Sequence, residues 1–260
     1  MYDAHVLVNG FPGRTSTHGS FGWSSVWLLR NADRVVVVDT GPPAYVPLIT
    51  QALAGLGLSP RDVTDVLVTH AHWDHLGNVS LFPQARRWIG RAEHAWACRQ
   101  ATDVPFVSQP LLGALSEPEG ALRLIDAEGE ILPGIHAIDA AGHTPGHLAF
   151  LAHTVRTPLL FVGDAAKNVH ELESSAIDSA LDLAAGRQSI SRIREIATST
   201  GAAVVPGHDV VCTLVDGHWQ RKSAQTAQLH FHHHRDAAPA RITISDQEPG
   251  LVAVRSDDAI

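Results

Sequence analysis

Short apolar runs separated by turn-forming residues dominate the first 162 residues of the chain. Runs of this kind, rich in valine, isoleucine and leucine and bounded by glycine, proline, asparagine or aspartate, are typical of buried β-strands. We predict strands at residues 5–8, 25–29, 34–38, 66–68, 87–90, 122–125, 135–139, 149–152, 159–162 and 202–205. The pattern therefore predicts a core built mainly from strands.

Apolar positions at helical spacing interrupt these strands. A covering helix is predicted within residues 42–57 and a shorter one over residues 92–100. The longest helical stretch covers residues 177–200, with a break expected at Gly186. Residues 101–120 contain three prolines and are predicted to be irregular. Strands and helices in this succession favour two stacked sheets flanked by helices.

Composition excludes several classes of protein. An apolar content of 45% is ample for a sizeable core, yet no stretch approaches the roughly 18 unbroken apolar residues of a membrane span. The N-terminal segment lacks the basic and apolar regions of a secretory signal, so we predict a cytoplasmic protein. The net charge of -8 argues against a nucleic-acid partner, and the two cysteines are too few and too far apart in sequence for a disulfide framework. The 17 histidines are the compositional outlier, and metal binding or a C-terminal cluster must explain them.

The densest group of potential metal ligands follows the predicted strand at residues 66–68. Four such residues lie within six positions: His70, His72, Asp74 and His75. Imidazole and carboxylate suit zinc, whereas calcium and magnesium prefer mainly oxygen and cuprous ions prefer sulfur. If His70 and His72 continue the strand, their side chains point the same way, and the next two ligands fall on a turn that addresses a second point. Two points suggest two metal ions, although Asp74 as a simple helix cap is the alternative.

Three later strands are each followed by a glycine and one ligand-type side chain, namely His143, Asp164 and His208. Each motif alone is compatible with an ordinary turn, but together they follow one rule. His147, in the first of these motifs, is interpreted as a support for the turn or for His143. Asp39, at the end of an earlier strand, is either a turn former or a support for a metal-bound histidine.

Together these residues resemble the metal-binding signature of the metallo-β-lactamase superfamily over residues 24–208, with all its ligand positions filled in the family's order. The resemblance implies an α/β fold, an αββα sandwich of two mixed β-sheets flanked by helices, with a dinuclear metal site at one edge of the sheets. It assigns the first metal to His70, His72 and His143. It assigns the second metal to Asp74, His75 and His208, and it places Asp164 as the bridge between both metals.

The carboxylate at position 164 favours the hydrolase branch of this family over true β-lactamases, and residues 141–147 are most similar to acyl-homoserine-lactone lactonases. The resemblance therefore implies two Zn²⁺ ions, with iron, manganese or cobalt as alternatives, that supply a hydroxide to open a lactone or cleave a related ester. Asp74 is the candidate for proton transfer to the leaving group. Such lactonases often carry tyrosine where this chain has Lys167, which either contacts the substrate or is an ordinary solvated lysine. The candidate catalytic residues are Asp74, Asp164 and Lys167.

Other functions stay open on the same scaffold. A glyoxalase II-like thioesterase is the first alternative, and a mononuclear iron sulfur dioxygenase is the second. A nuclease is disfavoured by the acidic charge, and a non-catalytic binding domain by the complete ligand set. The expected partner is a small-molecule substrate, whose contacts should come from the loops at residues 10–22 and 101–120.

The C-terminal part is predicted as a separate extension of the catalytic domain. Residues 1–215 are expected to form that domain, and residues 216–260 to form a histidine-rich extension packed on it. Residues 230–234, four of which are histidines, either gather metal or belong to a solvated helix end. Residues 241–244 and 251–254 are predicted to form a closing hairpin or a contact in a homodimer.

Overall fold

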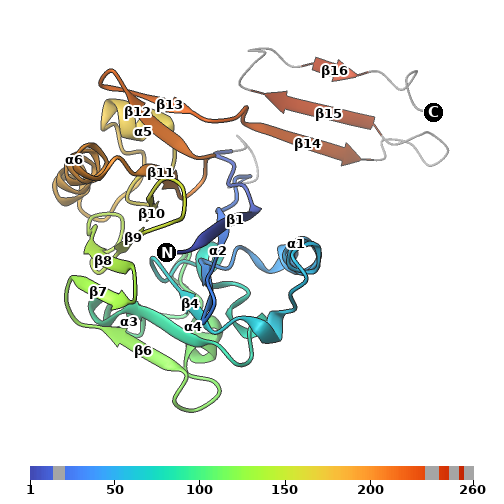
Figure 1. The fold of residues 1–260 in the computed structure, drawn as a ribbon, viewed down its shortest axis with the longest axis vertical. Helices are drawn as coiled ribbons and strands as arrows, with labels where there is room; N and C mark the ends of the chain where they lie inside the picture. Colours follow the sequence, from blue (N-terminus) through green and yellow to red (C-terminus); the bar gives the residue numbers. More distant parts are fainter. Residues whose placement is uncertain (14–20, 232–239, 246–251, 255–260) are drawn as a thin grey trace.

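Two stacked β-sheets form the body of the protein (Figure 1). The computed structural model describes residues 1–13, 21–231, 240–245 and 252–254. The first sheet has the strand order β1-β2-β3-β4-β5-β6, with the bounds Asp3–Val8, Val26–Arg30, Val35–Val38, Asp65–Leu67, Arg86–Gly90 and Leu122–Ile125. Strands β3 to β6 run parallel to one another, whereas β1, β2 and β3 pair antiparallel.

The second sheet has the strand order β13-β12-β11-β10-β9-β8-β7. From β7 to β13 the bounds are Gly129–Leu132, Ile135–Asp139, Leu148–Ala152, Leu159–Gly163, Ala203–Pro206, Cys212–Val215 and His218–Arg221. Strands β10 and β11 pair in parallel, and the other neighbours pair antiparallel. Both large sheets are therefore mixed.

Helices cover the outer faces of both sheets. Their bounds from α1 to α6 are Val46–Gly55, Trp73–Leu76, Arg91–Ala97, Gln109–Leu115, Val169–Ser174 and Leu183–Thr200. Three 3-10 turns occupy Pro43–Tyr45, Pro60–Asp62 and Val79–Leu81. Helices α1, α3 and α4 pack on the first sheet, and α5 and α6 pack on the second. In Figure 1, α1 and α6 lie on opposite sides of the molecule. Within the described residues, no helix combines the length and the apolar character needed to cross a membrane.

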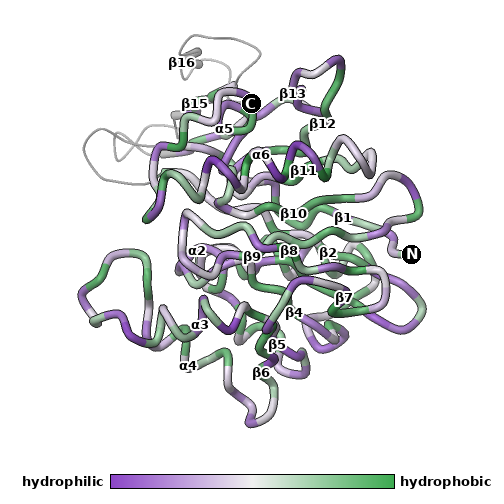
Figure 2. Tube along the Cα trace, turned by 90° about the vertical axis from the view of Figure 1, so that its left-hand side faces the viewer, coloured by the Kyte–Doolittle hydropathy of each residue, from purple (hydrophilic) through white to green (hydrophobic). Residues whose placement is uncertain are grey.

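The core between the sheets explains why the strands read as unbroken apolar runs. Along β2, Leu28 packs toward the helices on the first sheet, whereas Trp27 and Leu29 pack against the second sheet. Trp27 meets Phe161 of β10 with a distance of 5.8 Å between ring centroids. Because both faces of each sheet are covered, both sets of alternating side chains are apolar. Figure 2 shows hydrophobic stretches along the strands in the middle of the molecule. The predicted αββα sandwich is confirmed.

The long helix near residue 183 differs from its prediction. It begins at Leu183 rather than at residue 177, because the Asp182 side chain caps it by accepting the backbone N–H groups of Ala184 and Ala185. The predicted break at Gly186 is wrong. Gly186 lies inside the helix, where a Cβ built on Gly142 would lie 2.4 Å from its Cα. Glycine at position 142 therefore allows its loop to approach the helix backbone, and a Cβ on Gly186 would itself lie 2.7 Å from Cδ1 of Ile177.

Several short elements escaped prediction. Helix α4 lies within the segment that was predicted to be irregular, and its Pro110 stands in the first turn, where proline is compatible with a helix. Strands β7, β12 and β13 and helix α5 were also missed. Strands β7 and β12 are only partly buried, so their sequences lack a continuous apolar run.

The last part of the chain forms a third sheet beside the body (Figure 1). Strands β14 (Thr226–Phe231), β15 (Ala240–Ser245) and β16 (Val252–Val254) pair antiparallel in this order. The β15–β16 pair confirms the predicted C-terminal hairpin. His230 belongs to β14, so the expected helix end is wrong at this residue, and residues 232–234 lie outside the described part of the chain.

Candidate metal centre

Four chain segments that leave the two sheets converge at one edge of the sandwich. One follows β4 and continues into α2, and the others follow β8, β10 and β11. They bring together all the residues that the sequence nominated as ligands: His70, His72, Asp74, His75, His143, Asp164 and His208. Strand β4 ends at Leu67, so His70 and His72 lie on a loop and do not continue the strand, although both address the same group of ligands.

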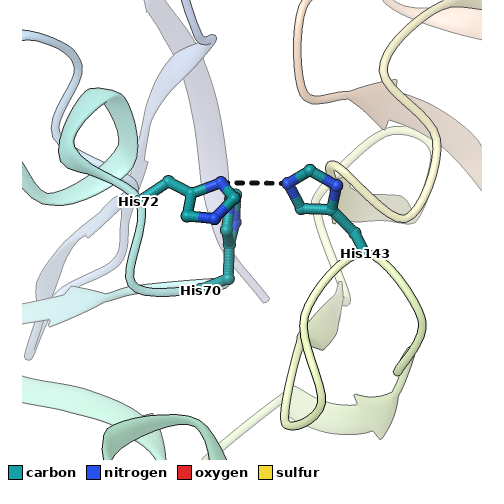
Figure 3. Close-up of side chains that lie close together, drawn as sticks. All are labelled: His70, His72 and His143. Carbon is teal, nitrogen blue, oxygen red and sulfur yellow. Dashed lines mark hydrogen bonds between the residues drawn. The ribbon is translucent and has the colours of Figure 1, made fainter. Parts of the chain in front are cut away.

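The first group of ligand-type atoms comes from His70, His72 and His143 (Figure 3). The rings of His70 and His72 approach from one loop, and the ring of His143 faces them from the other sheet. His143 Nε2 lies 3.0 Å from His72 Nδ1. The ring centroids of His70 and His143 are 4.9 Å apart. Three imidazole nitrogens that lie within 4.8 Å of one another form one face of a potential metal site.

The second group is arranged around Asp164. Its Oδ1 lies 3.2 Å from His75 Nε2 and 3.2 Å from His208 Nε2. Its Oδ2 lies 3.3 Å from His143 Nε2, which belongs to the first group. Asp74 Oδ2 completes the second group at 3.4 Å from His208 Nε2. The two oxygens of one carboxylate thus face two separate sets of imidazoles.

Buried atoms in this cluster fit a cation. His70 Nε2, His75 Nε2 and Asp164 Oδ1 are inaccessible to solvent and form no hydrogen bond. Unsatisfied buried polar atoms are costly, so three of them in one cluster indicate that a shared cation is their natural partner. Imidazole nitrogens with a few carboxylate oxygens form a donor set that suits zinc and other divalent transition metals. The residues present therefore fit a pair of such ions.

Hydrogen bonds to the rear nitrogens orient two of these rings. Asp39 Oδ2 lies 2.8 Å from His75 Nδ1, and the same carboxylate accepts the backbone N–H of Thr69. His143 Nδ1 lies 3.0 Å from the carbonyl oxygen of Ser179. Such contacts hold the N–H at the rear of the ring and direct Nε2 toward the cluster. Asp39 therefore contacts one of the histidines that it was expected to support.

His147 supports the cluster without facing it. Its Nε2 accepts the backbone N–H of Asp164 at 3.1 Å, so the imidazole fixes the turn that carries this carboxylate. Burial, reinforced by the neighbouring His143, holds the pKa of His147 well below its usual range. The ring is therefore neutral and keeps its acceptor nitrogen.

Burial and carboxylates divide the other histidines into two classes. Burial holds the pKa values of His70 and His72 well below the usual range, so both rings are neutral and can ligate a metal. Burial also acts on His75, but the carboxylates of Asp74, Asp39 and Asp164 outweigh it and raise its pKa well above the usual value. The carboxylate side of the cluster therefore requires positive charge, from protonated histidine or from metal ions.

Comparison with known proteins identifies the family. A family model described as the metallo-beta-lactamase superfamily matches residues 20–208, which is well over half of the chain. The chain belongs to this superfamily. The resemblance seen in the sequence is confirmed, and so is its closeness to the lactonase-like group, because curated relatives are lactonases.

Two relatives and two structures illustrate the similarity. An N-acyl homoserine lactonase from a Bacillus species is 26% identical over 232 residues, covering 79% of this chain and 88% of the relative. The N-acyl homoserine lactonase AttM of Azorhizobium caulinodans is 30% identical over 167 residues, covering 59% of this chain and 61% of the relative. An N-acyl homoserine lactone hydrolase with N-hexanoyl-L-homoserine at its catalytic metal centre superposes with a TM-score of 0.64 at 19% identity, covering 80% of this chain and 93% of that chain. AidC, a dizinc quorum-quenching lactonase, superposes with a TM-score of 0.65 at 19% identity, covering 77% of this chain and 79% of that chain. At these identities the two structures establish a shared fold.

A pocket of about 640 Å³ opens above the ligand cluster of this metallo-β-lactamase fold. Pro12, Gly13 and Gly22 line it from the glycine-rich N-terminal loop, and Phe106 lines it from the segment before α4. Both loops that were expected to contact substrate thus contribute to the pocket, although residues 14–20 lie outside the described part of the chain. Apolar groups on one side and ligand-type groups on the floor suit a small molecule with an apolar part.

Lys167 lines the same pocket, so it is not an ordinary surface lysine. Its ammonium donates to the carbonyl oxygen of Ser179 at 3.1 Å and lies 3.2 Å from Asp178 Oδ1 and 3.6 Å from Glu171 Oε1. Burial opposes the charge, but the nearby carboxylates of Asp164, Glu171 and Asp178 outweigh it and raise the pKa of Lys167. The side chain is therefore a fixed cation at the pocket wall.

Sequence reasoning missed two residues that act through the backbone. Ser179 contributes only its carbonyl oxygen to His143 and Lys167, so its side chain gives no signal. Glu93 is fully buried on α3, and its carboxylate accepts backbone N–H groups from two ligand-bearing loops. An acidic residue at the start of a helix looks like an ordinary first-turn residue, so the sequence gives no reason to select it.

Proposed function

We propose that this protein is a metal-dependent hydrolase that opens a lactone or cleaves a related ester. The observation that carries this proposal is the convergence of two ligand groups, joined by Asp164, on one cluster of buried, unsatisfied atoms at the floor of a pocket. The similarity to curated N-acyl homoserine lactonases supports a lactone as the substrate class.

The proposed metal sites follow the two groups of the cluster. His70, His72 and His143 would hold one ion. Asp74, His75 and His208 would hold the other, and Asp164 faces both groups. Two zinc ions are the proposed cofactors, although iron, manganese and cobalt accept the same ligands. When bound, such ions supply Lewis acidity and a hydroxide nucleophile near neutral pH.

Asp74 is proposed to move the proton that the leaving group requires. Its side chain is partly exposed at the pocket, and its Oδ2 lies at the edge of the cluster beside His208. The Ser24 hydroxyl donates to the backbone carbonyl of Asp74 and holds that segment in place. A carboxylate fixed between the cluster and the pocket can accept a proton at one oxygen and deliver it to the leaving alkoxide.

Lys167 is proposed to orient the substrate carbonyl. The ammonium is anchored by Ser179 and two carboxylates but still borders the pocket, so it presents positive charge toward a polarised oxygen. Because neighbouring carboxylates balance its charge, the pocket is better suited to a neutral substrate than to an anionic one. This arrangement favours a lactone over an anionic glutathione thioester.

The test combines metal analysis with a substrate panel. Protein purified without added metal should contain about two divalent transition-metal ions per chain and should release acid from lactones in a pH-indicator assay. The variant H208A should lose most of this activity, whereas H170A, which changes an exposed histidine on α5, should not. One iron per chain with oxygen consumption and no hydrolysis would contradict the proposal and select the sulfur dioxygenase alternative. Preference for glutathione thioesters would select the thioesterase.

A further inference from the structure

Glu93 joins the two loops that carry the first group of histidines. It belongs to α3, and its side chain is fully buried. Its Oε1 accepts the backbone N–H of Ala71 at 2.9 Å, and its Oε2 accepts the backbone N–H of Gly146 at 3.1 Å. Ala71 lies between His70 and His72, and Gly146 lies in the turn that follows His143. One carboxylate therefore spans a loop from each sheet.

The surroundings of Glu93 indicate a requirement for this carboxylate. Burial raises its pKa, although hydrogen bonds to the N–H groups of Ala71 and Gly146 counteract part of this effect. Burying an acidic group without a cation is costly, whereas an apolar side chain would avoid that cost. The two N–H groups explain the choice, because an apolar residue would leave both of them unsatisfied.

Close packing makes this contact rigid. A Cβ built on Gly146 would lie 2.1 Å from the backbone nitrogen of Glu93, so the turn after His143 rests directly on the start of α3. A larger residue could not approach so closely. The distance between the His143 turn and the His70–His72 loop is therefore set through α3 and the Glu93 side chain.

We propose that Glu93 is a positioning residue for one of the two metal sites, the one formed by His70, His72 and His143. This inference rests on the proposed function, because it requires that the cluster binds metal. Glu93 acts on the backbone of both loops and contacts none of the three imidazoles in the bonds described above. The Asp39 carboxylate, by contrast, reaches both groups: it lies 2.8 Å from His75 Nδ1 and accepts from the Thr69 hydroxyl, which lies 3.1 Å from His70 Nδ1. A change at Glu93 should therefore affect one site, whereas a change at Asp39 should affect both.

The experiment measures zinc affinity rather than catalysis. Metal-free protein is titrated with zinc in competition with a chromophoric chelator, which resolves the two binding steps. In E93Q the amide keeps one acceptor oxygen but turns an NH₂ group toward the second N–H. We expect one step to weaken by roughly 10- to 100-fold, as is usual when a group behind a ligand is removed. The other step should be unchanged, whereas D39N should weaken both steps.

The control is D65N, which changes another fully buried carboxylate. Asp65 binds Arg34, Arg86 and Trp88 at the start of β4, the opposite end of this strand from the ligand loop, so its loss should lower thermal stability and leave both zinc affinities intact. If E93Q lowers stability as D65N does and keeps both affinities, Glu93 is only structural and the proposal is wrong.

A second variant keeps the proposal testable if E93Q does not fold. E93D keeps both acceptor oxygens on a shorter side chain, and it should weaken the same zinc step by a smaller factor. Unchanged affinities in E93D would also overturn the proposal. If the wild-type protein binds zinc but hydrolyses no lactone, the proposed function is wrong, and the inference about Glu93 is unaffected. Wild-type protein that binds no divalent metal would refute both.

Discussion

Replacing Arg221 with methionine is expected to destabilise the protein by about 3 kcal/mol. Arg221 Nε lies 2.8 Å from Asp209 Oδ1, and its Nη2 lies 2.8 Å from Asp209 Oδ2. The Asp209 carboxylate is fully buried, whereas the Arg221 side chain is 24% exposed. Removing one partner of a buried pair leaves an uncompensated charge and costs roughly 3–5 kcal/mol. The lower end applies because Val169 and Gln225 still donate to this carboxylate.

This prediction tests how the C-terminal segment is joined to the catalytic body. Arg221 ends β13, and Asp209 directly follows His208 of the candidate metal centre. We propose that residues 216–260 pack on the same domain, with this pair reinforcing the pairing of β13 with β12. In thermal unfolding, about 3 kcal/mol corresponds to a fall of roughly 6 to 12 °C in Tm for a protein of this size. Urea unfolding would give the free energy directly.

Arg192 provides a matched control. It forms a two-pronged pair with Glu128, but both side chains are more than 40% exposed. The variant R192M removes the same side chain from water-accessible surroundings and should cost less than about 1 kcal/mol. In a double-mutant cycle, D209N should recover part of the loss in R221M, because it removes the unpaired charge. A cost of R221M no greater than that of R192M would refute the reasoning that the buried pair holds β13 against the body.

Two further predictions concern single side chains. K167M should keep its metal content but lose roughly 10²-fold in kcat/KM for lactones, the usual cost of removing one group that stabilises a developing negative charge. The control K222M, which changes an exposed lysine, should not lose activity. If K167M is as active as wild type, Lys167 makes no substrate contact that matters for the reaction. In thiol titration at pH 8, only the exposed Cys98 should react in the folded protein, because burial raises the pKa of Cys212 to about 12. Equal reactivity of the two thiols before urea is added would contradict the buried position of Cys212.

The ligand residues could be predicted because their chemistry is visible in the sequence. His143, Asp164 and His208 each follow a glycine at the end of an apolar run, and such side chains have no packing reason to be there. The sandwich was predictable for a related reason, since strands covered on both faces appear as continuous apolar runs. Periodicity and residue type were thus sufficient where side chains carry the interaction.

The remaining features depend on contacts that residue type does not reveal. Glu93 and Ser179 act on or through backbone groups, which every residue possesses. Gly186 looked like a helix break, because only the folded structure brings the loop of Gly142 against it. His70 and His72 do address the same group, as expected, but β4 ends before them, so the loop and not the strand period orients their rings.

Each candidate ligand group combines residues from both large sheets, and this division has a consequence for how the protein matures. Residues before β7 contribute His70, His72, Asp74 and His75, and residues after it contribute His143, Asp164 and His208. No group is complete within either half. Since binding to the native state alone stabilises that state, ions that bind here favour docking of the two halves. The complete ligand set arises only once both sheets have formed and stacked, so metal uptake would mark the end of folding.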